Sequence, residues 1–178
     1  MQSLKALDLH KLDVSKVENL SWFFSGCSFK TVDLSNIDLP KAESMAGIFA
    51  NCDKLTSVNL SSIRTPMLDN ISCMFQNCTS LPSADLGGMD TSKVRLMGRL
   101  FAGCTSLKSA DIQNCNTANV SYMNRMFQGC SSLQTCDLSN FRTPKLESAY
   151  GMFDGCTSLK EIDISHFDMN GASTTTVG

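Results

Sequence analysis

The sequence predicts an α/β solenoid of the leucine-rich-repeat type, with about seven turns of 26 residues, a parallel sheet on one face and short helices on the other. Three observations support this prediction. A Phe-x-x-Cys unit recurs along the chain, a strand-like phrase with a central Asp follows each copy, and a segment with helical spacing precedes the next copy. A unit repeated in this way buries its apolar face only by stacking on its neighbours.

The Phe-x-x-Cys unit sets the period of the repeat. Its cysteines recur every 26 residues, with one residue missing from the second copy: Cys27, Cys52, Cys78, Cys104, Cys130 and Cys156. An incomplete seventh copy begins at residue 157. A chain of 178 residues suits one domain with a substantial core. We therefore predict a single solenoid domain over residues 2–170 and a linker-like polar tail over residues 171–178.

The first half of each unit has the pattern of a strand with one buried face. In the fifth copy Leu107, Ala110 and Ile112 are apolar, while Asp111 stands between the last two. Alternation of this kind directs the apolar residues inward and the Asp outward. A further apolar residue follows each strand, where we expect the chain to turn a corner around it: Leu12, Ile37, Ile63, Met89, Cys115, Phe141 and Phe167.

The second half of each unit predicts a short helix of about two to three turns, because its apolar residues are three and four apart. Thr65-Pro66 and Thr143-Pro144 offer an N-cap followed by a first-turn proline, and Ser15 with Glu18 has capping-box spacing. The residue before each repeated Cys is one that accepts the left-handed backbone of a helix C-cap: Gly26, Asn51, Asn77, Gly103, Gly129 and Gly155.

The repeated cysteines are predicted to face the inside of the coil as small buried hydrophobes with free thiols. Stacked repeats place equivalent residues about 4.8 Å apart, which is within disulfide range, so a bonded pair remains an alternative. Parallel side-chain directions argue against that alternative. Cys73 lies outside the column, and we expect it to be an exposed thiol without a role. On the same side, Arg99 and Arg125 predict a solvated outer face, while Trp22 and Tyr150 predict packing between turns.

The repeat resembles the BspA-like leucine-rich repeats of bacterial surface proteins. The phrases that carry the resemblance are Leu4-x-x-Leu7-x-Leu9, Asp137-Leu-Ser-Asn-Phe-Arg-Thr143 and Met126-Phe-Gln-Gly-Cys-Ser-Ser-Leu133. The resemblance implies a secreted or surface-anchored protein that acts in adhesion and host interaction. The first eight residues lack the apolar stretch of a secretory signal, which would fit a fragment of a larger protein.

Outward strand residues form one exposed surface, and its central column is the candidate binding site: Asp8, Asp33, Asn59, Asp85, Asp111, Asp137 and Asp163. Mostly small and hydroxyl-bearing residues flank this column. Three interpretations are open. The column is a solvated row whose carboxylates accept hydrogen bonds from neighbouring Ser and Thr, a docking surface for a basic protein segment or polar glycan, or a ladder for calcium ions. The Asp/Gly loop pattern of known calcium sites is missing.

Charge and residue spacing argue against several classes of function. Fifteen basic and seventeen acidic residues leave a net charge of -2, so the chain has no basic field for nucleic acid or an anionic membrane. No apolar run approaches the roughly 20 residues that span a bilayer, and the segment is not expected to insert into one. His10 and His166 lie six turns apart, and no catalytic constellation, phosphate loop or metal-ligand spacing is visible. We therefore predict no enzyme activity and no cofactor.

The sequence and the resemblance together favour a non-enzymatic interaction module at a bacterial cell surface or outside the cell. We expect its strand face to bind a protein or a glycan of unspecified identity. A structural spacer that presents another domain, with no ligand of its own, is the alternative. Exposed ends of an uncapped coil invite end-to-end association, so the oligomeric state is open.

Overall fold

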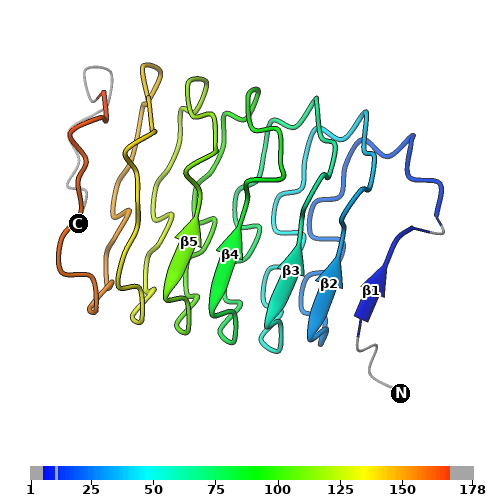
Figure 1. The fold of residues 1–178 in the computed structure, drawn as a ribbon, viewed down its shortest axis with the longest axis horizontal. Coiled ribbons are helices and arrows are strands. Elements are labelled where there is room, and N and C mark those ends of the chain that lie inside the picture. The colour runs from blue at the N-terminus through cyan, green and yellow to red at the C-terminus, as the bar shows by residue number, and fades with distance from the viewer. Residues whose placement is uncertain (1–5, 11, 169–178) are drawn as a thin grey trace.

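The computed structural model describes residues 6–10 and 12–168, which wind into a stack of similar coils (Figure 1). Five three-residue strands lie side by side along one face: β1 (Ala6–Asp8), β2 (Thr31–Asp33), β3 (Ser57–Asn59), β4 (Ser83–Asp85) and β5 (Ser109–Asp111). We number the coils one to seven, each of the first six ending at a repeated Cys. The polar tail predicted at 171–178 and the last two residues of the predicted domain lie outside the described residues.

The strands pair in parallel at a constant register, which confirms the repeat solenoid. Thr31 of β2 lies opposite Ala6 of β1 and Ser57 of β3, offsets of one repeat in each direction. β4 and β5 pair in the same way, with Ser83 opposite Ser109. A second line of single bridges runs along the other side of the coils, at Asn19, Ser44, Asn70, Leu96, Tyr122 and Ser148. Most neighbouring coils are therefore bonded on two sides.

The predicted short helices are wrong: residues 6–10 and 12–168 contain no helix. Each coil instead makes consecutive turns, in which an N–H donates to the carbonyl three residues earlier, as from Ala102 to Arg99 at 3.1 Å. Intervening N–H groups donate to the next coil, as from Arg99 to Asn124 at 2.9 Å and from Phe101 to Met126 at 2.8 Å. A chain of such turns buries the same residues as a helix, so apolar spacing alone does not distinguish the two.

Left-handed backbone occurs at two places in each chain of turns and explains why a helix does not form. The predicted Gly and Asn positions before each Cys all have positive φ, from 59° at Asn77 to 76° at Gly103. Four residues before these lies a second such column, occupied by Trp22, Gly47, Cys73, Arg99, Arg125 and Gly151. A residue with positive φ in mid-segment is incompatible with a right-handed helix, so the turns prevail.

Two side-chain columns fill the inside of the coils. The phenylalanines of the repeat stack from Phe24 to Phe153, with neighbouring ring centroids 5.4 to 6.1 Å apart. The repeated cysteines lie beside them and, apart from the half-buried Cys27 of coil one, are buried. The corner residues are buried as predicted except Leu12 of the first coil, which is 60% exposed.

Of the two threonines expected to cap helices, Thr143 bridges coils instead, whereas the Thr65 hydroxyl is buried without a hydrogen-bond partner among the described residues. Thr117, at the equivalent position in coil five, shows the bridging geometry. Thr117 donates its hydroxyl to the Arg142 carbonyl at 2.9 Å and accepts the Arg142 N–H at 2.9 Å. Thr143 accepts the Asp168 N–H at 3.0 Å in the same way. The N-cap prediction fails because no helix follows. The Ser15 backbone and hydroxyl bond to Asp13 rather than to Glu18.

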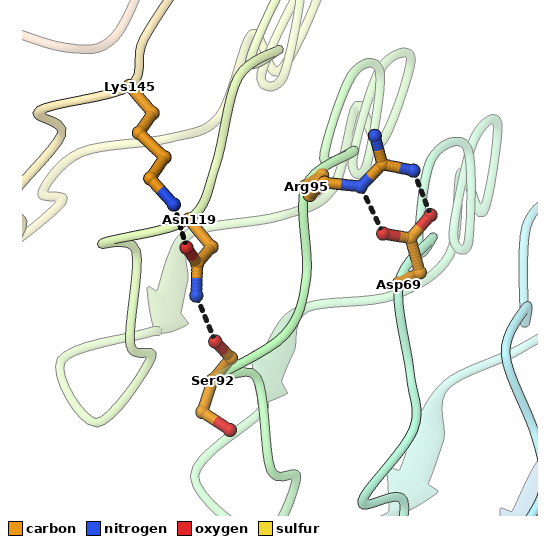
Figure 2. A network of polar contacts seen from close by, with 5 residues as sticks. All are labelled: Asp69, Ser92, Arg95, Asn119 and Lys145. Atoms are coloured by element: carbon orange, nitrogen blue, oxygen red, sulfur yellow. Dashed lines mark hydrogen bonds and ion pairs between the residues drawn. The ribbon is translucent and has the colours of Figure 1, made fainter.

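Polar side chains tie neighbouring coils at the surface, one repeat apart (Figure 2). Arg95 forms a two-pronged ion pair with Asp69, at 2.6 and 3.0 Å. Lys145 donates to the Asn119 side-chain oxygen at 2.6 Å, and Asn119 donates to the Ser92 carbonyl at 2.7 Å. Within the described part of the chain, no helix is long and apolar enough to cross a membrane.

Candidate functional site

The strand face carries the predicted column in the expected place. The strand face comprises the outward residues of β1 to β5. It also includes residues 135–137 and 161–163, which occupy the equivalent positions in coils six and seven. The column members with described side chains are all exposed and lie one coil apart: Asp33, Asn59, Asp85, Asp111, Asp137 and Asp163. Asp8 is in register with Asp33, but its side chain lies outside the described residues.

Most column side chains bond back to their own coil. The side-chain oxygen accepts the N–H two residues later, at 2.9 Å from Ser35 to Asp33 and at 2.7 Å from Gly87 to Asp85. The same bond forms at Asn59, Asp137 and Asp163, at 3.1, 2.9 and 2.8 Å. The donors are mostly serines, as the solvated-row interpretation expects, but the bond comes from the backbone. These side chains therefore define the turn that ends each strand.

Hydrogen bonds also favour the ionised form of two column members, Asp137 and Asp163. The Ser139 backbone N–H, and then its side chain, lower the pKa of Asp137. The Ser165 side chain, and then its backbone, lower the pKa of Asp163, and His166 adds a smaller effect. Asp137 and Asp163 are thus exposed anions at neutral pH.

Among the described residues, no group of three His, Cys, Asp or Glu side chains is placed to hold a metal ion. The calcium interpretation therefore has no coordinating cluster in this part of the chain. His10 bonds through Nε2 to the Ser35 carbonyl at 2.8 Å in coil two, whereas His166 lies exposed in coil seven. The structure does not bring the two histidines together.

The cysteines are free thiols, so the disulfide alternative is wrong. Each buried thiol of the column donates to the Phe carbonyl of the preceding coil, as from Cys104 to Phe75 at 3.0 Å and from Cys130 to Phe101 at 3.1 Å. Burial raises the pKa of Cys78 and Cys130 to about 12, and that of Cys104 well above its ordinary value. Protonated, enclosed thiols are poor nucleophiles. The sequence indicated that these thiols are buried, but it did not indicate this hydrogen bond between neighbouring coils.

The strand face has a discontinuity that sequence reasoning missed. β3 and β4 are not paired, and the sheet divides into β1-β2-β3 and β4-β5. In the other coils the N–H before the strand donates to the preceding coil, from Thr56 to Lys30 and from Lys108 to Pro82, both at 2.9 Å. Pro82 occupies that position in coil four and has no N–H to donate. A cavity of about 270 Å³ lies at the break, between Ser57 and Asp85 among others.

The opposite side of the coils, which we call the turn face, contains a second cavity of about 400 Å³. The turn face consists of the turn segments 19–27, 44–52, 70–78, 96–104, 122–130 and 148–156. The cavity brings together Arg99, Arg125 and Tyr150, which the sequence placed on this side, with Tyr122 and Gly98, which it did not single out. Cys73 also lines it and is half-buried rather than exposed, and burial raises the pKa of its thiol. The repeat spacing predicted that these side chains share one face, but it did not predict that they line one cavity.

The exposed aromatic side chains of the turn face pack as expected. The Trp22 ring lies over Gly47, where a Cβ atom would clash with it. Arg125 lies over the Tyr150 ring, with its Cζ 5.4 Å from the ring centroid. These contacts link one coil to the next while leaving the rings half-exposed, at 51% for Trp22 and 46% for Tyr150.

Comparison with known families places this repeat. The family described as "Mycoplasma protein of unknown function, DUF285" matches residues 1–86 and again residues 69–177. The chain belongs to this family. The two matched ranges overlap at residues 69–86 and together cover nearly the whole chain. Comparison with curated proteins finds no match.

Two solved structures are similar to this DUF285 chain. A leucine-rich repeat protein of T. pallidum is 23% identical, with 79% of this chain and 70% of that chain covered and a TM-score of 0.44. A leucine-rich repeat protein from Bacteroides ovatus ATCC 8483 is 18% identical, with 79% and 62% covered and a TM-score of 0.22. Neither comparison indicates a catalytic family. The fold itself rests on the register of this chain's own coils.

Proposed function

We propose that this chain is a non-enzymatic interaction module of a bacterial cell-surface protein and acts in adhesion or host interaction. The strand face is its binding surface. A basic protein segment is the ligand that fits the face best, and a polar glycan is the second choice. The BspA-like resemblance of the repeat supports the surface location, and the word Mycoplasma in the description of the family supports a bacterial source.

The observation that carries this proposal is the row of exposed, oriented carboxylates. Hydrogen bonds to the backbone hold five of the six described column side chains in one orientation, so binding loses little side-chain entropy there. Neighbouring strands are about 4.8 Å apart, which places successive anions within reach of alternate side chains of an extended basic segment. A row of this kind attracts cations over a distance that salt shortens.

The test removes charge from the row without removing its turns. Asn59 makes the same backbone bond as the aspartates, at 3.1 Å, so Asp→Asn is tolerated geometrically at this position. The variant D85N/D111N/D137N should keep its melting temperature and lose about tenfold or more of its affinity for a Lys/Arg-rich 12-residue peptide, as well as attachment to matrix-coated wells. The control E18Q/E43Q/D53N removes three charges outside the row.

Unchanged peptide binding and attachment in the folded triple Asn variant would contradict the proposal. That outcome supports the spacer function, in which the coil presents another domain. The continuous bonding between coils would then serve stiffness alone. Loss of binding in both variants would show a dependence on net charge and would also count against a strand-face site.

A further inference from the structure

The cavity of the turn face has features that the strand-face proposal does not use. It lies on the opposite side of the coils and spans coils three to six. Its volume of about 400 Å³ is within the range of small-ligand sites. Gly98, Arg99, Tyr122, Asn124, Arg125 and Tyr150 contribute to its lining.

A missing side chain creates the hollow. Gly98 stands where the next two coils carry Asn124 and Tyr150, one and two repeats later. A Cβ atom on Gly98 would meet only the Asn124 carbonyl, at an ordinary 3.5 Å, so packing does not require glycine here. The effect of the glycine is to leave the floor of the cavity open between larger side chains.

The two arginines of the cavity differ from the other three in the chain. Arg64 and Arg95 form ion pairs with Asp38 and Asp69 of the preceding coil. Arg142 donates to two carbonyls of its own corner, at 2.8 and 2.9 Å. Within the described ranges, neither the Arg99 nor the Arg125 guanidinium has an ion pair or donates a hydrogen bond.

Arg99 and Arg125 also carry two unfavourable features side by side. They lie at equivalent positions of neighbouring coils, so their backbones are about one strand spacing apart, and both cations line the same cavity. Both have left-handed backbone, with φ of 54° and 55°, where coils two and six place Gly47 and Gly151. Strain and like charge at one place indicate a function, because folding alone would favour glycine. An anion between the two guanidinium groups would relieve the repulsion.

The tyrosines define the rest of the ligand. Tyr122 and Tyr150 are 38% and 46% exposed beside the arginines. The Tyr122 hydroxyl donates to Glu147, and the Tyr150 ring lies under Arg125, so both rings are held. Aromatic faces with a negative quadrupole pack well against the C–H groups of a saturated ring. Asn124 lines the same wall, and its side-chain oxygen is buried without a hydrogen-bond partner among the described residues.

We propose that this cavity binds an anionic sugar residue, carboxylated or sulfated, with Arg99 and Arg125 holding the anion and Tyr122 and Tyr150 packing against the sugar ring. An acidic peptide shares the charge but lacks the ring, so the tyrosines favour the sugar. This proposal is independent of the strand-face function. Its variants leave the aspartate row untouched, and the two proposals can fail separately.

The experiment measures binding of 3′-sialyllactose and of a 4-sulfated chondroitin disaccharide by calorimetry, with neutral lactose alongside. We expect one or both anionic sugars to bind and lactose not to bind. The variant R99G/R125G should keep its fold, since Gly47 and Gly151 occupy this position with φ of 59°. It should lose about tenfold or more of the affinity for the anionic sugar. The control K30Q/K108Q removes two exposed charges next to the strands and should bind normally.

A third variant separates a sugar site from a simple anion site. Y150S places serine where Ser72 stands in coil three, and we expect it to weaken sugar binding severalfold while the melting temperature persists. Binding by R99G/R125G equal to that of the native chain would overturn the proposal. Four other results would also overturn it. These are equal binding of lactose, no binding of either anionic sugar, normal sugar binding by Y150S, and tighter binding of a poly-glutamate peptide than of either sugar.

Discussion

The strand face and the turn face are built from the same repeat, yet they bond their coils differently. On the turn face the ladder is unbroken, from Gly26 donating to Ala50 at 2.7 Å to Gly129 donating to Asp154 at 2.7 Å. On the strand face pairing stops between β3 and β4, and beyond β5 it is reduced to a single bridge from Ser109 to Thr135. One face thus holds the stack together, and the other tolerates interruption.

The difference shows where this repeat has freedom to vary. The turn face combines the backbone ladder with the phenylalanine and thiol columns directly beneath it, so a change there affects two coils at once. The strand face packs smaller side chains, since Val58, Ala84 and Ala110 occupy its inward position in coils three to five. A surface that contributes less to stability is the one that can adapt to a ligand.

Truncation beneath each face gives the largest expected contrast. Phe101→Ala removes a fully buried ring stacked on Phe75 and Phe127, and we expect a loss of about 3 to 5 kcal/mol in the free energy of unfolding. Val58→Ala should lower it by about 1 kcal/mol, because the side chain is half-buried and the next coils already have alanine there. Urea denaturation measures both. Equal losses would remove the contrast between the faces.

Proline substitution tests the two ladders directly. Cys73→Pro removes the N–H bonded to Gly98 at 2.9 Å and replaces a φ of 58°, so we expect a loss of about 2 to 4 kcal/mol. Lys108→Pro removes the bond to Pro82 on the strand face and should cost about 1 kcal/mol. Thermal and urea unfolding provide the comparison. A larger loss for Lys108→Pro would reverse the assignment of the two faces.

High pH should weaken the turn-face interior through its thiols. Burial raises the pKa of Cys78 and Cys130 from 9.0 to about 12, so the native state keeps protons that the unfolded state releases between these values. Their contribution is therefore complete below pH 9 and declines as the pH rises toward 12, by at most about 1.4 kcal/mol per pH unit for each thiol. The variant C78A/C130A should start less stable and show a shallower decline in urea denaturation from pH 8 to 10.5. Parallel declines would contradict this origin.

The repeat made the solenoid and its inward columns predictable from the sequence. The local hydrogen bonding of the backbone was not predictable in this way. A fixed offset of 26 residues assigns each Phe, Cys and Asp to a side of the coil, whatever the backbone does between them. It does not distinguish a helix from a chain of turns, because Met123, Met126 and Phe127 are buried equally well by either. The distinction depends on which carbonyl each N–H reaches, and half of those carbonyls belong to the next coil.

The candidate sites were predictable to the same extent. The position of the aspartate column followed from alternation, but its backbone bonds depend on the turn after each strand. Pro82 was readable in the sequence as a residue without an N–H, yet its effect appears only once Thr56 and Lys108 are seen to donate at the same position. Likewise, the cavity at Gly98 arises from side chains of four coils, and no single repeat reveals it.

Amide hydrogen exchange tests the central claim that the turn face holds the coils together and the strand face opens between β3 and β4. The Leu34 and Leu86 amides donate to the next coil at 2.9 and 3.0 Å, whereas the equivalent Leu60 amide has no backbone partner within the described residues. We predict slow amide exchange at Cys73 and Arg99 and fast exchange at Leu60. In the variant Pro82→Gln, exchange at Leu60 should become slower, because Gln134, the residue equivalent to Pro82 in coil six, donates its N–H to the preceding coil. Leu60 protected as strongly as Leu34 and Leu86 in the native chain, or Cys73 and Arg99 exchanging as fast as Leu60, would contradict it.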